Sequence, residues 1–360
     1  MGRRSVSGGT SGSTGETLAD LARLAGVSRS TASRVLSASG YASPEACARV
    51  MEAVESLGYR PNRVARNLRQ QRTRTLGLIV EDVQNSFYSQ VTRGVEEAAR
   101  QRGHQTVLVN TNADPQQEEA SIKLLQETRV DGIVVTPSST ASDRLYKPLV
   151  EQGFPVVQVD LEAYRGPGSV SVVGDNLRAA RRATEHLLER GHRDIAILVD
   201  RPSLVTVQQR IRGYRAALAA YGIPFRDDRV CTSPVRGSAK VRIVQEVFSQ
   251  RPNLTAVFAT TNSVAAELVQ AMSEEGLSCP DDLSIVGFDD APWMGFFPTP
   301  ITAVHQPAIQ MGKLAADLLL DRLAGRVFDT PKRVTVTAEL ILRASVRRVS
   351  GGGSVAKDHQ

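Results

Sequence analysis

TLADLARLAGVSRSTASRVLS, residues Thr17–Ser37, determines the expected fold of the N-terminal region. Its apolar residues recur at helical spacing in two short segments separated by Gly26. Thr17 is suited to cap the first helix, because its hydroxyl can accept a backbone N–H of the first turn. Gly26 ends that helix, since glycine readily adopts the left-handed conformation of a helix C-terminus. Ser28 is expected to cap a second helix that buries one face and exposes arginines and serines on the other.

A third helix is predicted to complete a small core. It begins at Ser43-Pro44, a capping residue followed by a proline in the first turn, and runs to Gly58. Two short helices joined by a Gly-containing turn, together with a third, predict a helix-turn-helix domain over residues 17–60. We expect the three helices to bury Leu18, Leu21, Ala22, Leu24, Ala25, Thr31, Ala32, Val35, Leu36, Val50, Met51, Val54 and Leu57.

The second helix carries polar side chains opposite its apolar face. In a helix-turn-helix this helix enters the DNA major groove, where its N-terminal residues meet base edges. Arg29 and Arg34 can each offer a bidentate guanidinium to guanine, and Ser30 can bond to any base. An ion pair within the small domain is the alternative for Arg34. The candidates for the phosphate backbone and its approach are Thr17, Leu18, Ser28, Thr31, Ser33 and Asn62.

Basic charge is concentrated in the same region. Residues 1–74 contain 12 Arg and 5 Asp and Glu, a net charge of +7, whereas residues 75–360 contain 32 basic and 33 acidic residues. A basic segment of this kind predicts a polyanionic partner, although a solvated tail would give the same count. Residues 1–16 are rich in Gly, Ser and Thr, which predicts a flexible tail.

Composition limits the compartment. Cys47, Cys231 and Cys279 have no metal-like spacing and suit a reducing cytosol. The first residues lack the apolar core of a signal peptide, and no apolar run approaches the roughly 18 residues that cross a bilayer. We therefore expect a soluble cytoplasmic protein with no membrane partner.

The opening stretch, followed by GYRPNRVARNLR at residues 58–69, resembles the DNA-binding head of the LacI/GalR family of bacterial transcription regulators. The likeness extends over about residues 17–345. It implies that residues 61–74 form a hinge helix and linker, with residues 62–68 in the minor groove at the operator centre. Leu68 would wedge into the central base step and bend the DNA, and Ala65 would let two hinge helices approach each other.

Residues 75–345 alternate short Val/Ile-rich strands with helices, beginning with TLGLIVED at residues 75–82. Such strands predict buried parallel sheets, and their number predicts two doubly wound lobes with a ligand cleft at the strand C-termini. The predicted fold is an all-α helix-turn-helix head plus an α/β two-lobed sensor like periplasmic binding proteins. We expect lobe 1 at about residues 75–161 and 293–323, lobe 2 at about 162–292 and 324–345 with a helix near 238–250, and a disordered tail at 346–360.

The resemblance also implies which residues bind an effector. Arg210 in QQRIRGYRAAL matches the family arginine that binds effector hydroxyls or a carboxylate, and Asp289 in VGFDD matches its acidic partner. An arginine, carboxylates and aromatic rings together are typical of polyol sites. A salt bridge between the lobes is the alternative for Arg210, Asp160 and Asp289. The other expected cleft residues are Phe87, Tyr88, Asp160, Thr206, Thr261 and Gln306.

Three departures from the family pattern leave the effector open. Leu161 stands where the family often has an arginine after the aspartate, Thr261-Asn262 replaces a common Asn-Asp, and Ser86 replaces a proline. A neutral sugar, a sugar acid or a phosphorylated metabolite would each be compatible with this. The shortage of basic residues near Arg210 argues against a highly charged ligand.

Enzyme motifs are missing from the sequence. It contains no Walker A loop, no G-x-G-x-x-G after a strand, no H-E-x-x-H and no G-x-S-x-G. His186 and His192 flank one helix end, where a surface or capping role fits better than a metal. We predict no catalytic residue, metal or cofactor. The alternatives to a regulator are an α/β enzyme and a sugar-binding protein with a basic tail.

The expected function is that of a ligand-responsive, sequence-specific DNA-binding transcriptional regulator. The family likeness implies a homodimer, with a tetramer as the alternative, on a pseudo-palindromic double-stranded operator. Dimer contacts are expected from the helix over residues 86–102 and from segments near 262–295. A small sugar-like effector would separate the hinge helices and release carbohydrate-metabolism genes from repression. Some relatives use their effector as a corepressor, so the sign of the response is open.

Overall fold

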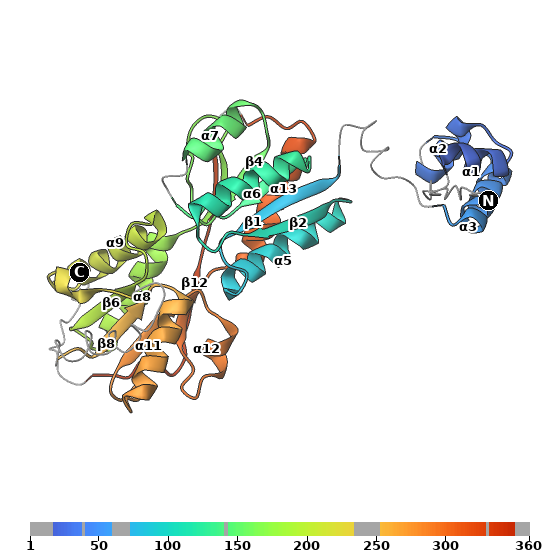
Figure 1. Cartoon of the computed structure of the whole chain (residues 1–360). Coiled ribbons are helices and arrows are strands. Elements are labelled where there is room, and N and C mark those ends of the chain that lie inside the picture. Colours follow the sequence, from blue (N-terminus) through green and yellow to red (C-terminus); the bar gives the residue numbers. More distant parts are fainter. Residues whose placement is uncertain are drawn as a thin grey trace, which may run out of the picture. The chain divides into compact units, whose positions relative to one another are not determined.

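The computed structural model describes residues 17–37, 40–59, 73–139, 143–233, 253–328 and 331–349. The chain divides into two compact units, a head that ends at Thr73 and a sensor that begins at Arg74 (Figure 1). The hinge residues Asn62, Ala65 and Leu68, and the helix expected near 238–250, lie outside the described residues.

The head contains the three predicted helices, α1 (Leu18–Leu24), α2 (Arg29–Ser37) and α3 (Pro44–Leu57). Thr17 caps α1 through a reciprocal pair of bonds with Asp20, Ser28 Oγ accepts the Thr31 N–H at 3.1 Å, and Ser43 caps α3. The predicted caps are therefore confirmed, because each offers a side-chain oxygen to an N–H that the helix itself cannot satisfy.

The core of the head is smaller than the sequence suggested. Leu21, Ala22, Ala25, Ala32, Val50 and Ala53 are buried at its centre. Leu24 and Met51, which we expected in the core, are 55% and 51% exposed. Short helices bury a narrow stripe, and both residues lie at its margin, where helical spacing alone does not decide burial.

The first lobe of the sensor is built on a six-stranded parallel sheet with the order β11-β5-β4-β3-β1-β2. Helices α5 and α13 pack against one face, where their side chains share a core cluster with Leu76, Leu78 and Val80. Helices α6 and α7 cover the opposite face, on which Ile79 and Ile133 are buried. The elements of this lobe are β1 (Thr75–Val80), α5 (Ser86–Gln101), β2 (Gln105–Asn110), α6 (Pro115–Glu127), β3 (Gly132–Val135), α7 (Asp143–Glu151), β4 (Val156–Val159), β5 (Val170–Gly174), α13 (Ala308–Leu323) and β11 (Lys332–Val336).

The second lobe repeats this architecture with the order β12-β10-β9-β8-β6-β7. All its pairings are parallel except that between β10 and β12. The predicted doubly wound sheets are therefore confirmed. The elements are α8 (Asn176–Glu189), β6 (Ile195–Val199), α9 (Val205–Ala220), a 3-10 turn (Asp227–Arg229), β7 (Val230–Thr232), β8 (Ala256–Ala259), α11 (Asn262–Glu274), β9 (Ser284–Phe288), α12 (Pro292–Phe296), β10 (Thr302–His305) and β12 (Glu339–Ile341).

The chain passes between the two lobes three times, and the expected lobe boundary was wrong at each of these three passages. β5 pairs with β4, so the chain leaves the first lobe after Gly174 rather than near 161. β10 pairs with β9, so the return comes after His305 rather than near 293. β11 belongs to the first sheet and β12 to the second. Buried strands such as β5 and β10 share one apolar pattern whichever sheet they join, and the largely exposed edge strands β11 and β12 carry little apolar pattern, so the sequence did not show this exchange.

The passages run side by side. The Asp175 N–H donates to the Val336 carbonyl at 3.1 Å, and Asp175 Oδ1 accepts the Ala338 N–H at 3.1 Å. A Cβ on Gly174 would lie 2.0 Å from Gln306 Oε1. Hydrogen bonds and close packing therefore tie the three segments that connect the lobes.

The last described segment is ordered against the second lobe, in contrast to the disordered tail expected from residue 346. Val346 is buried, and the Val349 N–H donates to the Arg190 carbonyl at 2.9 Å. His192 is fully buried rather than at the surface, with Nδ1 2.8 Å from Thr255 Oγ1 and Nε2 3.2 Å from the Arg347 carbonyl. Residues 350–360 lie outside the described part of the chain.

A prediction concerns this buried imidazole. Burial lowers the pKa of His192 to about 4, so the folded protein holds it neutral while the unfolded chain protonates it below about 6.5. Its contribution to stability is present above pH 6.5 and is lost as the pH falls towards 4, by about 2 kcal/mol at pH 5. Thermal unfolding at pH 7 and pH 5 should show a smaller acid-induced drop in Tm for His192→Gln than for the wild type. Equal drops would contradict this role.

Helices α5 and α13 approach closely through reciprocal glycines. A Cβ on Gly94 would lie 2.1 Å from the Ile309 carbonyl oxygen, and one on Gly312 would lie 2.2 Å from the Val91 carbonyl oxygen. The two backbones therefore touch where any side chain would separate them. This contact fixes α13, which arrives from the second lobe, against the first helix of the sensor.

Gly312→Ala should consequently destabilise the sensor, although glycine to alanine normally favours a helix by about 1 kcal/mol. Overpacking at a backbone contact costs about 1–3 kcal/mol. Gly295→Ala in α12 is the matched control, because its Cβ would meet only Arg343 Nη2 at 4.0 Å. Denaturant unfolding should show a lower midpoint for Gly312→Ala and an unchanged or higher midpoint for the control. A stable Gly312→Ala variant would show that the helices separate at little cost.

Candidate functional site

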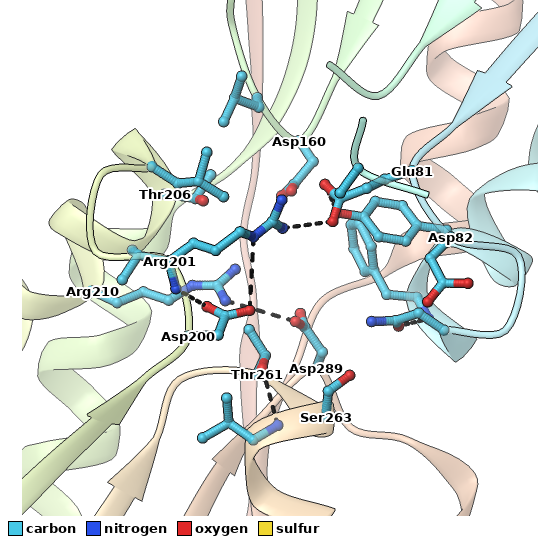
Figure 2. Close-up of a pocket in the computed structure, with 18 of the residues that line it drawn as sticks. Glu81, Asp82, Asp160, Asp200, Arg201, Thr206, Arg210, Thr261, Ser263 and Asp289 are labelled. Atoms are coloured by element: carbon cyan, nitrogen blue, oxygen red, sulfur yellow. Dashed lines mark hydrogen bonds and ion pairs between the residues drawn. The ribbon is translucent and has the colours of Figure 1, made fainter. Parts of the chain in front are cut away.

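The carboxyl ends of both sheets face a single cleft between the lobes (Figure 2). Glu81 follows β1 and Asp160 follows β4 on one side, while Asp200 follows β6 and Asp289 follows β9 on the other. This convergence is the ordinary consequence of parallel strands, which place their following loops at one edge. The cleft has a volume of about 160 Å³, below the roughly 300–1,000 Å³ of sites for drug-sized molecules.

Arg210 occupies the second-lobe wall and is almost completely buried. Its Nε donates to Asn176 Oδ1 at 2.8 Å and its Nη1 to the Thr260 carbonyl at 2.5 Å. The guanidinium carbon lies 3.8 Å from the centre of the Phe288 ring. These contacts hold a cation at the cleft surface through the hydrogen bonds and aromatic face that a buried guanidinium requires.

Asp289 is the acidic neighbour of Arg210, as the resemblance implied. Its Oδ2 lies 3.7 Å from Arg210 Nη1, and its Oδ1 accepts a hydrogen bond from Gln306 Nε2 at 2.7 Å. Burial raises the pKa of Asp289 against the opposing effect of Arg210. Arg210 and Asp289 belong to the same lobe, so their pair does not join the lobes.

Asp160 projects from the first lobe into the cleft (Figure 2). Asp160 and Asp289 both have positive φ, 68° and 61°, a conformation that aspartate tolerates better than most residues. Burial raises the pKa of Asp160 to about 6, with Arg210 acting in the opposite direction. Its Oδ1 is buried and has no hydrogen-bond partner among the described residues.

An ion pair does cross the cleft, between residues that the sequence reasoning missed. Arg201 Nη2 lies 2.6 Å from Glu81 Oε1, and Glu81 Oε2 accepts the Tyr88 hydroxyl at 3.0 Å. Burial raises the pKa of the Glu81 carboxyl, and Arg201 opposes that rise. A signal was present, because Glu81 and Arg201 each stand within two residues of the end of a predicted strand. The expected shortage of bases near Arg210 was therefore overstated.

The remaining predicted effector residues fall into two groups. Phe87, Tyr88, Thr206 and Thr261 line the cleft. The Phe87 and Tyr88 rings pack edge to face at 5.2 Å, and Thr261 caps α11 by accepting the Val264 N–H. Gln306 is not among the lining residues; it lies behind Asp289 in a passage between the lobes and positions that carboxylate. Asn85 adds a second polar link across the lobes, since its Oδ1 accepts Asn262 Nδ2 at 2.9 Å.

The predicted DNA-facing side chains of the head are gathered on α2 and its cap. Ser28, Arg29, Ser30 and Arg34 are exposed, while Thr31 and Ser33 are half-buried. Ser28 Oγ lies 2.8 Å from both Ser30 Oγ and Thr31 Oγ1, and Arg34 Nη2 donates to Thr31 Oγ1 at 3.3 Å. Leu18, expected both in the core and near the DNA, is half-buried and packs against the core of the head.

Among the described residues, no group of three or more His, Cys, Asp and Glu side chains could hold a metal ion. None of the helices described there combines the length and apolarity that crossing a bilayer requires.

Known families match both units. A model described as periplasmic binding proteins and sugar binding domain of the LacI family matches residues 73–344, and one described as bacterial regulatory proteins of the lacI family matches residues 17–62. The chain is 31% identical to the transcriptional repressor PurR of Vibrio parahaemolyticus over 338 residues, 93% of this chain and 99% of that protein. It is 30% identical to the ribose operon repressor of Escherichia coli over 329 residues, covering 91% and 99%.

Solved structures agree. A complex of the regulator CelR with cellobiose has 31% identity and a TM-score of 0.67, covering 92% of this chain and 99% of that one. A LacI family regulator from Enterococcus faecium with bound ribose has 28% identity and a TM-score of 0.67, covering 77% and 100%. The lac repressor dimer bound to operator, at 22% identity and a TM-score of 0.81 over 92% and 99%, shares the fold. The chain therefore belongs to the LacI family of bacterial regulatory proteins and is a ligand-responsive, DNA-binding transcriptional regulator.

Proposed function

We propose that this protein is a repressor whose dimer binds a pseudo-palindromic operator and is released when a small sugar-like effector enters the interlobe cleft. One observation carries the proposal: the same chain exposes Arg29 and Arg34 on a capped second helix and encloses Arg210 and Asp289 in a cleft. Both named relatives are repressors, the transcriptional repressor PurR and the ribose operon repressor.

The head supports direct reading of base edges. Arg29 and Ser30 are exposed in the first turn of α2, the part of a recognition helix that reaches bases in the major groove. Ser28 leaves the helix start capped and exposed, which suits a phosphate oxygen. We assign Arg29 and Arg34 to bases and Thr17, Ser28 and Ser33 to the backbone, and retain Asn62, Ala65 and Leu68 as the proposed hinge contacts.

The cleft supports a small polyol. Arg210 and Asp289 offer a charged donor and acceptor side by side, and Phe87 and Tyr88 contribute rings at the opposite wall. Hydroxyls bind charged groups strongly while rings cover the C–H faces of a sugar. Cellobiose and ribose, the ligands of two similar regulators, belong to this class, and the modest volume favours the smaller of them.

Exposed apolar side chains support a homodimer. On the second lobe, Phe296 is 88% exposed beside a groove lined by Trp293 and Phe297. On the first lobe, Val107 and Leu108 are exposed on the edge strand β2. Monomers rarely expose apolar groups in this way, so we assign dimer contacts to these faces, near the helix and segments expected from the family.

The test begins with selection of bound sequences from a random DNA pool. Enrichment of one palindrome, with affinity that falls steeply with salt, is the expected result and supplies the operator. Sugars are then screened for release of that operator. Salt-sensitive binding without enrichment, in the presence and absence of a metabolite extract, would contradict the assignment of α2 as a sequence reader.

Arg29→Ala is expected to relax sequence preference at one symmetric pair of operator positions, at a cost of about 1–3 kcal/mol for the cognate base. Affinity for operators carrying each base at each position measures this. Arg326→Ala, which removes an exposed charge from the sensor, should leave the preference unchanged. Uniform weakening on all sequences would instead make Arg29 a phosphate contact.

Arg210→Met should abolish effector-dependent operator release while the protein still binds the operator. The substitution keeps an apolar stem against Phe288 and removes the guanidinium that faces the cleft. Arg212→Met, an exposed neighbour on α9, is the matched control and should respond like the wild type. Release of the Arg210→Met variant at wild-type effector concentrations would place the effector elsewhere.

A further inference from the structure

The cleft carries a large excess of negative charge among its described residues. Its lining contains two guanidinium groups, those of Arg201 and Arg210. Six carboxyl groups share that lining, an excess of four. They come from both lobes and from five different strand ends or helices: Glu81, Asp82, Asp160, Asp200, Glu267 and Asp289.

Both guanidinium groups are already engaged. Arg201 lies between Glu81, at 2.6 Å, and Asp200, at 3.9 Å. Arg210 donates to Asn176 and to the Thr260 carbonyl and faces Asp289. An anionic ligand would have to separate an existing ion pair in a buried site, which costs the desolvation of the carboxylate left behind.

Asp160, in contrast to the two arginines, has a carboxylate oxygen that accepts no hydrogen bond from the described residues. Its backbone N–H bonds to the Val172 carbonyl at 2.9 Å, but its buried Oδ1 has no partner among the described residues. A buried oxygen left unsatisfied is costly. The charged groups that act on Asp160 are Arg210, Asp289, Glu81 and Arg201, and the nearby carboxyl groups make a cationic donor more favourable than a neutral one.

We propose that the effector carries a protonated amino group, bound by Asp160, on a hydroxylated frame such as an amino sugar, and that phosphorylated and carboxylated sugars are excluded. This inference rests on the proposed role of the cleft. The frame hydroxyls bind Arg210 and Asp289. A bound ammonium would oppose the burial that raises the pKa of Asp160 to about 6, and would so favour the carboxylate further.

Matched sugars test the charge preference. Calorimetry on the full-length protein compares D-glucose, D-glucosamine and D-glucose 6-phosphate, and the same three forms of D-galactose. We expect the amino sugar of a set to bind at least about tenfold more tightly than its neutral form, and the phosphate not to bind. An equal or tighter neutral or phosphorylated form would overturn the proposal.

The Asp160→Asn variant tests whether Asp160 recognises the amino group or contributes to the binding of any sugar. It should weaken the amino sugar by at least about tenfold and the neutral sugar by less than about threefold. Asp317→Asn, an equal charge change on the exposed surface of α13, should leave both affinities unchanged. Equal weakening of both sugars by Asp160→Asn, with an unchanged Tm, would show that Asp160 does not recognise an amine.

A second measurement needs no effector. A single cysteine is placed at the cleft by Ser263→Cys, in a variant with Cys47, Cys231 and Cys279 replaced by alanine, and reacted with methanethiosulfonates that carry a trimethylammonium or a sulfonate group. Gln126→Cys on α6 is the surface reference. The cation-to-anion rate ratio should be at least about tenfold higher at 263 than at 126.

The sugar-binding measurements and the thiol-modification rates can contradict the proposal independently of each other. A rate ratio at 263 equal to or below that at 126 overturns the charge selectivity whatever the sugars do. A cation-preferring ratio with no sugar bound supports the charge selectivity and removes the sugar frame from the proposed function. Arg210→Met, measured for operator binding and release, continues to test the role of the cleft itself.

Discussion

Most charged groups of the cleft are where they are because parallel strands end together. Both sheets of the sensor turn their carboxyl ends towards the same space, so that strand-and-helix cycles far apart in sequence deliver side chains to one place. Arg210 comes instead from the second turn of α9, the helix that follows β6. From there it can reach Asn176 at the start of α8 and the Thr260 carbonyl at the end of β8.

The passages between the lobes link this edge to the rest of the sensor. Gln306, in the second passage, holds Asp289 with its amide nitrogen while its oxygen lies against Gly174, in the first. Asp175 in turn bonds to Val336 and Ala338, in the third. A displacement of Asp289 would therefore be transmitted to the segments about which the lobes would move. The same passages lead into α13, whose glycine contact with α5 gives the first lobe little freedom to deform internally.

The sequence predicted the elements well and their partners less well. Caps, glycines at helix ends and apolar strands are local signals, and Thr17, Ser28, Ser43 and Gly26 behave as these signals indicate. Which sheet a strand joins is not a local property: β5 and β10 are short buried strands that would suit either sheet, and β11 is a largely exposed edge strand with little apolar pattern. Arg210 and Asp289 were found through family likeness, whereas Glu81 and Arg201 were missed because each pairs with a residue over a hundred positions away. Gln306 was placed in the cleft because a polar residue beside a crossover resembles a ligand contact as much as a support.

The interlobe pair also limits how an effector could act. A ligand changes an equilibrium only through unequal affinity for its two states. Glu81 and Arg201 form an ion pair across the lobes, and Asn85 and Asn262 add a hydrogen bond. What a ligand adds is a partner for Asp160, on the first lobe, joined to contacts with Arg210 and Asp289, on the second. Such a bridge acts where the structure leaves an acceptor unsatisfied, so the free energy available for switching is concentrated at one carboxylate rather than spread over the cleft.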